Sequence, residues 1–188
     1  DAETADVLIY VENASLSLGS CSFSTQRRFA IYLRGGSLDM ADCAIWDADT
    51  AVALTQGATG TIRGGEFTNN GSNAVWVSGQ NSYGALTDSV ISYGARGVSV
   101  DDNAQLLIEN SDIFNSTEAA VFVDNSSVRL TNVFIDGAEN FGIYSQNQSQ
   151  LAVTGVQISG PVGTAISLGD TVGELDDIRI LDATTALT

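Results

Sequence analysis

The chain has 188 residues, of which 44% are hydrophobic, so it is long enough for one folded domain and too apolar for a disordered one. Seven Arg residues and no Lys or His stand against 23 acidic residues, which gives a formal net charge of -16. This balance excludes the basic surface that a nucleic acid partner requires, and no stretch approaches the roughly 20 apolar residues of a membrane-spanning helix.

The first predicted elements are three short strands separated by two sharp bends. Apolar residues alternate with small or polar ones over residues 9–11, around Leu18 and around Phe23, and this period of two is that of a β-strand. Asn13 and Ser20 lie between these strands. Short polar residues at such points favour a turn of the chain.

The same unit recurs along the rest of the chain, at steps of 22, 22, 24, 22, 22, 23 and 22 residues. Four apolar rows result: Phe23, Ile45, Phe67, Ile91, Ile113, Ile135, Ile158 and Ile180; Leu18, Met40, Ile62, Leu86, Ile108, Leu130, Val153 and Leu175; Ile9, Ile31, Val52, Val75, Val98, Val121, Ile143 and Ile166; and Val11, Leu33, Leu54, Val77, Val100, Val123, Ser145 and Leu168. A fixed period of this length indicates a solenoid, and the local period of two excludes a helical one.

Two further columns predict where the chain turns. They are Asn13, Gly35, Gly57, Asn81, Asn103, Asn125, Gln148 and Asp170, and Ser20, Asp42, Gly64, Asp88, Asn110, Asn132, Gly155 and Asp177. Asn, Asp and Gly tolerate a positive φ, so we expect a sharp bend at each position.

The predicted fold is all-β: a right-handed, single-stranded parallel β-helix of about eight coils, with roughly 22 residues and three strands per coil. At about 4.8 Å per coil the rod is on the order of 40 Å long. We expect residues 1–188 to form one solenoid domain, cut at the start of a ninth coil because Ala186-Leu187 repeats Ala165-Ile166.

These columns resemble the right-handed parallel β-helix superfamily that includes pectate lyases, polygalacturonases, phage tailspikes, autotransporter passengers and NosD-like repeat proteins. The resemblance covers nearly the whole chain and concerns architecture, since fold does not fix activity. Enzymes of this superfamily generally carry long loops that build a cleft, whereas the coil length here varies by only a residue or two. The amphipathic helix that often caps their N-terminal end is also missing.

Cys21 and Cys43 occupy equivalent positions in adjacent coils, which places their Cα atoms about 4.8 Å apart, within disulfide range. Inward side chains in register point the same way, which favours two stacked free thiols; export from the cell favours the disulfide instead. Both alternatives stay open here, although we prefer the free thiols. Two thiols without His do not make a zinc site, so no metal site is expected.

Catalysis by this chain would have to use carboxylates, because it has no His or Lys to act as a base. Glu66 and Asp112 share an outward column at about 10 Å, near the upper limit for an inverting glycosidase, but a solvated strand face explains them equally well. The pair Asp101-Asp102 precedes a bend and is interpreted as turn chemistry. We therefore favour a non-enzyme and expect no cofactor, with Ca²⁺ at acidic turns a general expectation for exported rods.

An outward column rich in aromatic residues is the main candidate for a partner face. It contains Tyr10, Tyr32, Trp76, Phe122 and Tyr144, together with Ala53, Ser99 and Ser167. A column of small residues from Ala30 to Ala165 runs beside it, so we expect the rings to stand on an open sheet face. Such rings stack on sugars, dock on a protein, or only cover the neighbouring backbone.

Three classes of function compete: a structural or adhesive rod, a carbohydrate-binding module, and a polysaccharide-degrading enzyme. Regular short coils, few catalytic residues and an acidic surface that suits export favour the first, a secreted or cell-surface stalk, filament or adhesin segment. Its expected partner is another protein or a second copy of the chain, or else a glycan, with no nucleic acid and no membrane insertion.

Overall fold

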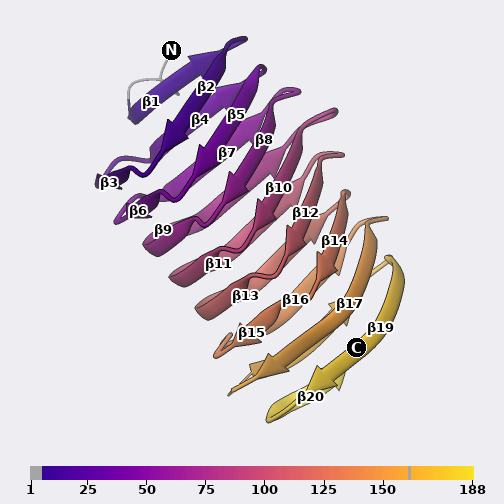
Figure 1. The fold of residues 1–188 in the computed structure, drawn as a ribbon. Helices are drawn as coiled ribbons and strands as arrows, with labels where there is room; N and C mark the ends of the chain where they lie inside the picture. Colours follow the sequence, from indigo (N-terminus) through magenta and orange to yellow (C-terminus); the bar gives the residue numbers. More distant parts are fainter. Residues whose placement is uncertain (1–5, 161) are drawn as a thin grey trace.

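The computed structural model describes residues 6–160 and 162–188, and it places all of their regular structure in parallel strands of one solenoid. Figure 1 shows the coils stacked into a rod, with β1 at one end and β20 at the other. No helix among the described residues is long and apolar enough to cross a membrane.

The rod has three faces, each a parallel sheet. The first face contains β1 (Val7–Glu12), β4 (Phe29–Arg34), β7 (Thr50–Thr55), β16 (Phe141–Gln146), β18 (Val162–Leu168) and β20 (Ala183–Leu187). The second face contains β2 (Ser15–Gly19), β5 (Ser37–Ala41), β8 (Thr59–Arg63), β10 (Tyr83–Thr87), β12 (Gln105–Glu109) and β14 (Ser127–Thr131). The third face contains β3 (Ser22–Ser24), β6 (Ala44–Trp46) and β15 (Phe134–Asp136).

Five long strands bend through a corner and belong to two faces. The strands β9 (Glu66–Ser78), β11 (Val90–Asp101) and β13 (Asp112–Asp124) run from the third face to the first, and β17 (Gln150–Ser159) and β19 (Val172–Ile180) run from the second face to the third. The expected three separate strands per coil are therefore fused at these corners. The ladder continues through the corner because a register shift between Gly94 and Arg96 absorbs the change of direction.

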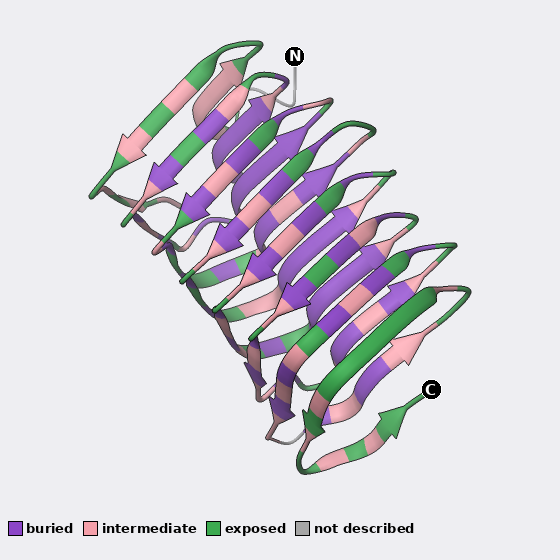
Figure 2. Ribbon diagram, turned by 45° about the vertical axis from the view of Figure 1, so that its right-hand side comes forward, coloured by how far each residue is buried: buried purple, intermediate pink, exposed green. Residues whose placement is uncertain are grey.

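The four apolar rows are confirmed residue by residue. Phe23 pairs with Ile45 and Ile45 with Phe67, and Leu18 pairs with Met40 and Met40 with Ile62. The same register continues along the remaining coils. Together with the inward column from Ala30 to Ala165, the rows form the hydrophobic core, apart from Leu175 near the end of the chain, which is 36% exposed. Figure 2 shows buried positions along the middle of the rod and largely exposed ones in its last strands. The chain thus forms the predicted right-handed β-helix of about eight coils.

The polar exception in these rows is accommodated inside the rod. Ser145 is fully buried, and its hydroxyl lies 3.0 Å from the Thr171 hydroxyl. A buried hydroxyl with a partner costs much less than an unpaired one, so the row tolerates it.

Both predicted bend columns are also confirmed. All sixteen positions have a positive φ, from 47° at Asn125 to 81° at Gly57. A third column of the same kind was not identified from the sequence: Asp47, Asn69, Tyr93, Asn115, Gly137, Gly160 and Asp182. It marks the corner between the third and first faces. The pattern was not recognised because Thr25, at the equivalent position of the first coil, and Tyr93 are not residue types that favour a bend.

Connections between successive described strands are short. The longest have four residues, at 25–28, 79–82 and 137–140. Within the described chain no loop is therefore long enough to rise as a wall above a face, and each face is bordered only by tight bends.

Candidate functional site

The aromatic column lies on the outer side of the first face, in the predicted register. Tyr10 pairs with Tyr32, Ala53 with Trp76, and Phe122 with Tyr144. A second outward column, which we call the flanking column, runs beside it on the same strands: Val7, Phe29, Thr50, Asn73, Arg96, Ala119, Phe141 and Thr164. The two columns interdigitate into a packed layer outside the rod.

One cluster of this layer covers the first four coils. The ring of Phe29 lies 4.8 Å from that of Tyr32 and is stacked on Trp76 at 6.1 Å, while Tyr32 is stacked on Tyr10 at 5.9 Å, all between ring centroids. These rings cover Ala53, which is fully buried although it points away from the core. Apolar burial outside the rod thus adds to stability here.

A second cluster covers the fifth, sixth and seventh coils. Tyr144 is stacked on Phe141 at 4.6 Å and tilted toward Phe122 at 5.7 Å. The guanidinium of Arg96 lies over the Phe122 ring at 3.9 Å, within cation–π range, and it also donates two hydrogen bonds to Glu118, of 3.0 and 2.6 Å. The Arg96 side chain therefore covers one side of this second cluster.

The expectation of an open aromatic face is wrong in this respect. Tyr32 is only 6% exposed and Phe122 only 9%, while Tyr10, Trp76 and Tyr144 are half-buried. The small residues from Ala30 to Ala165 belong to the core rather than to the outer surface. The rings form a preordered layer whose outer edges alone meet solvent.

The aromatic layer has a hollow beside Trp76. The indole N–H of Trp76 donates a hydrogen bond of 2.9 Å to Oδ2 of Asp101, which lies in the next coil opposite Ser78. A cavity of about 180 Å³ beside it is lined by Arg28, Phe29, Asp49, Thr50, Ser72, Asn73 and Trp76. Within the described residues, Oδ1 of Asn73 and Oδ1 of Asp101 are buried without a hydrogen-bond partner. The hollow thus combines a ring edge, the Arg28 cation and the Asp49 carboxylate.

A hydrogen-bonded network borders the second cluster. The Tyr144 hydroxyl donates to Gln146 at 2.7 Å, and Gln146 and Asn147 donate to Asp124 at 3.2 and 2.7 Å. These bonds hold the exposed end of the Tyr144 ring in one orientation. Sequence reasoning did not find this network, because its members lie in different columns.

The two weak catalytic candidates lie on another face. Glu66 and Asp112 share an outward column of the third face, as predicted, but Val90 stands between them in the register. Glu66 is exposed and Asp112 half-buried, and none of the described cavities is lined by either of them. Their catalytic role stays a prediction.

Asp101 and Asp102 have different roles. Asp102 has a φ of 56° and begins the bend that Asn103 continues, as expected for turn chemistry. Asp101 ends β11 and accepts the Trp76 hydrogen bond, a role that the sequence did not indicate.

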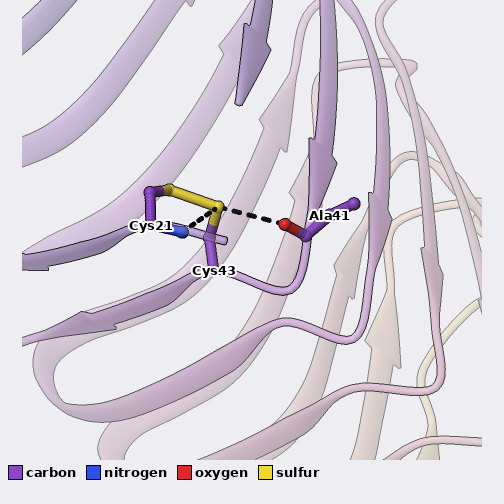
Figure 3. Close-up of a disulfide and its surroundings, with 3 residues drawn as sticks. All are labelled: Cys21, Ala41 and Cys43. Carbon is purple, nitrogen blue, oxygen red and sulfur yellow. Dashed lines mark hydrogen bonds between the residues drawn. A yellow bond between two sulfur atoms is a disulfide. The ribbon is translucent and has the colours of Figure 1, made fainter. Parts of the chain in front are cut away.

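Cys21 and Cys43 form a disulfide, so the preference for free thiols is wrong (Figure 3). Their Cα atoms are 4.5 Å apart, close to the predicted coil spacing. The backbone N–H of Cys21 also lies 3.3 Å from Sγ of Cys43. The bond joins the first two coils at the corner between the second and third faces.

Metal binding was expected only in the general form of Ca²⁺ at acidic turns. Within residues 6–160 and 162–188, no three or more His, Cys, Asp or Glu side chains come together as a group that would hold an ion. No particular Ca²⁺ site can therefore be named among these residues, and calcium binding stays a prediction.

The most exposed aromatic side chains lie outside the predicted column. Tyr93 is 58% exposed at the corner between the third and first faces, Tyr83 is 38% exposed on the second face, and Trp46 is 36% exposed on the third. Phe114 and Phe134, packed edge-to-face at 5.9 Å, lie on the same third face. They were not found from the sequence because they are spread over several columns, each with few aromatic residues.

A family model and one solved structure agree with this architecture. The family model described as "Right handed beta helix region" matches residues 29–177. The A-module of the Azotobacter vinelandii mannuronan C-5 epimerase AlgE4 superposes with a TM-score of 0.51 at 10% identity, over 93% of this chain and 76% of that one. QnrB1, a plasmid-mediated fluoroquinolone resistance protein, gives a TM-score of 0.24 at 11% identity, over 90% and 91%. No curated protein matches the chain. The likeness to the epimerase shows the fold alone.

Proposed function

Because the chain belongs to the family of right-handed β-helix regions, we propose that it works as an extracellular structural or adhesive rod that meets a second copy of itself through its first face. The observation that carries this proposal is the unbroken stack of coils, in which no connection between described strands exceeds four residues. Such a stack is stiff along its axis and offers flat faces rather than a cleft.

The aromatic layer supports the choice of the first face. Trp76 is held by Asp101 and Tyr144 by Gln146, so both rings are already ordered before a partner arrives. Binding to ordered rings loses little rotamer entropy, and aromatic side chains contribute much of the affinity of protein interfaces. Ring edges that remain half-exposed are then the points of contact.

Self-association through this face is tested by sedimentation velocity at rising protein concentration in about 0.5 M NaCl, where the charge of -16 is screened. We expect dimers or larger assemblies of the wild type and a monomer for the variant Trp76→Ala/Tyr144→Ala. Trp46→Ala, which removes an exposed ring from the third face, is the matched control. Assembly that survives the double substitution would contradict a role of the first face.

A second candidate, carbohydrate binding, is favoured by the hollow beside Trp76. Its ring edge, the Arg28 side chain and the Asp49 carboxylate are the groups with which proteins hold a sugar ring and its hydroxyls. A Trp46→Phe background leaves Trp76 as the sole indole, so titration with acidic and neutral polysaccharides reports on this hollow through fluorescence. Emission that no polysaccharide changes would remove the candidate.

A further inference from the structure

A polar groove runs along the rod between the first bend column and the second face, away from the aromatic layer. Three adjoining cavities of about 320, 290 and 480 Å³ compose it. They share lining residues: Gln105 lines the first two, Gln150 the first and third, and Ser127 all three. Volumes of this size are those of ligand sites in proteins.

Two columns of side chains form the walls of its central part. Asn103, Asn125 and Gln148 come from the bends, and Gln105, Ser127 and Gln150 come from β12, β14 and β17, where they are in register. We call these six residues the amide groove. Tyr83, which precedes Gln105 in the register and is 38% exposed, stands at one end.

The floor of the groove is closed, and its polar groups already have hydrogen-bond partners within the protein. Ala104 and Ser126 are buried beneath the walls. The Ala104 N–H donates to the Ser126 hydroxyl at 3.2 Å, and the Ser126 N–H donates to that of Ser149 at 3.3 Å. The floor therefore offers shape to a ligand, and polar contacts must come from the walls.

The five wall amides are exposed, and within the described residues none of their side chains takes part in a hydrogen bond to the protein. Other amides of the rod behave differently. Asn132 donates to Asn110, Asn147 to Asp124, and Asn69 to Asp47. The donors and acceptors of the groove are thus open to a ligand along about three coils.

The groove is also neutral at its centre, although the chain carries a charge of -16. Its ionisable side chains, Arg129 and Glu174, line only the outer cavities. Amides pair with hydroxyl groups as both donor and acceptor, whereas a charged ligand would find no counter-ion at the centre.

We propose that the amide groove binds a linear neutral glycan, lying along the rod axis. Equivalent amides recur at the coil spacing of about 4.8 Å, and a hexose unit of an extended chain advances by a similar length. An extended peptide fits worse, because its side chains on any one side recur every two residues, about 6.7 Å apart. The proposal does not depend on the role of the first face.

The test is isothermal titration calorimetry with neutral linear hexasaccharides built from glucose, mannose and galactose. We expect at least one of them to bind the wild type, and the variant Gln105→Ala/Gln150→Ala to bind it about tenfold more weakly, because two pairs of hydrogen bonds are lost. Gln26→Ala removes an exposed glutamine at another corner and should leave the affinity unchanged. Circular dichroism of each variant checks that the fold is kept.

Three results would overturn the proposal. One is the absence of binding to all three neutral hexasaccharides. Another is binding that the double variant retains in full, which would place the sugar elsewhere on the rod. The third is binding of a uronic acid hexamer as tight as that of its neutral counterpart, because a neutral groove should bind the charged chain more weakly. Emission from Trp76 separates this site from the hollow on the first face, since a ligand in the groove leaves it unchanged.

Discussion

Tyr93 adopts a backbone conformation that is unfavourable for a bulky side chain. It has a φ of 57° in a bend column whose other members are Asn, Asp or Gly, and its ring is 58% exposed. A bulky side chain in the left-handed region is strained by about 1–2 kcal/mol, and so exposed a ring recovers little by packing. The residue therefore costs stability at a position where Asn115, one coil further, adopts the same bend without that cost.

Replacing Tyr93 by Asn should therefore raise the free energy of unfolding, by about 0.5–1 kcal/mol, because Asn enters this conformation more easily. Urea denaturation followed by circular dichroism measures the change. The reverse substitution in the next coil, Asn115→Tyr, is the matched control and should lower stability by about 1–2 kcal/mol. A destabilised Tyr93→Asn variant would mean that the exposed ring makes contacts that outweigh the strain.

Among the elements, the corner between the second and third faces carries a ladder in which Cys and Ser occupy equivalent positions. The Ser89 N–H donates to the Ser111 hydroxyl at 3.1 Å, and that hydroxyl donates to the carbonyl of Glu109 at 2.8 Å. Cys43 lies in the equivalent place, with its sulfur 3.3 Å from the Cys21 nitrogen and 3.3 Å from the Ala41 carbonyl oxygen, but a disulfide sulfur carries no hydrogen and donates nothing to that carbonyl. The disulfide thus replaces one rung of a serine ladder by a covalent bond.

The double variant Cys21→Ser/Cys43→Ser should keep the fold and loosen the first coil. Loss of the cross-link lowers the stability of that coil by about 3 kcal/mol, the value for a closed loop of this size. Cys21→Ala/Cys43→Ala should lose about 1 kcal/mol more, since alanine cannot form the rung. Native-state hydrogen exchange in β1, β2 and β3 measures both effects.

Reduction of the wild type supplies the control. Dithiothreitol should speed exchange in the same three strands and leave β12–β14 unchanged, because in a solenoid each coil contacts only its neighbours. Equal exchange before and after reduction would contradict a stabilising role of the bond.

At the scale of the whole molecule, the charge of -16 opposes the compact rod. The described residues form three ion pairs, Arg34–Glu12, Arg63–Asp39 and Arg96–Glu118, all at the surface. Exposed pairs contribute at most about 1 kcal/mol each. Repulsion among the remaining carboxylates should outweigh them, since a Debye length of about 30 Å at 0.01 M salt spans much of the rod.

Added salt should therefore stabilise the protein. We expect the Tm to rise by at least about 2 °C between 0.01 and about 0.5 M NaCl, as measured by differential scanning calorimetry. The variant Glu174→Gln/Asp176→Asn neutralises two exposed carboxylates of β19 and should show a smaller rise. A Tm that falls with salt would mean that the ion pairs dominate.

The fold was largely predictable from the sequence, and the candidate site only in part. The apolar rows and both identified bend columns are confirmed, since each environment recurs in every coil and one exception such as Ser145 does not hide the pattern. The aromatic column was found for the same reason. Its coverage by Phe29, Arg96 and Phe141 was not, because these belong to a neighbouring column.

The sequence by itself determined the period of this protein, the side chains that face its core and the positions of two of its bends, because these follow from repetition along one column. Only the tertiary structure decided how different columns meet. It placed a bond between Cys21 and Cys43, packed rings over Ala53 and lined a groove with free amides. Such contacts depend on the curvature of the coil and on the direction of each side chain, and neither is contained in a spacing of 22 residues.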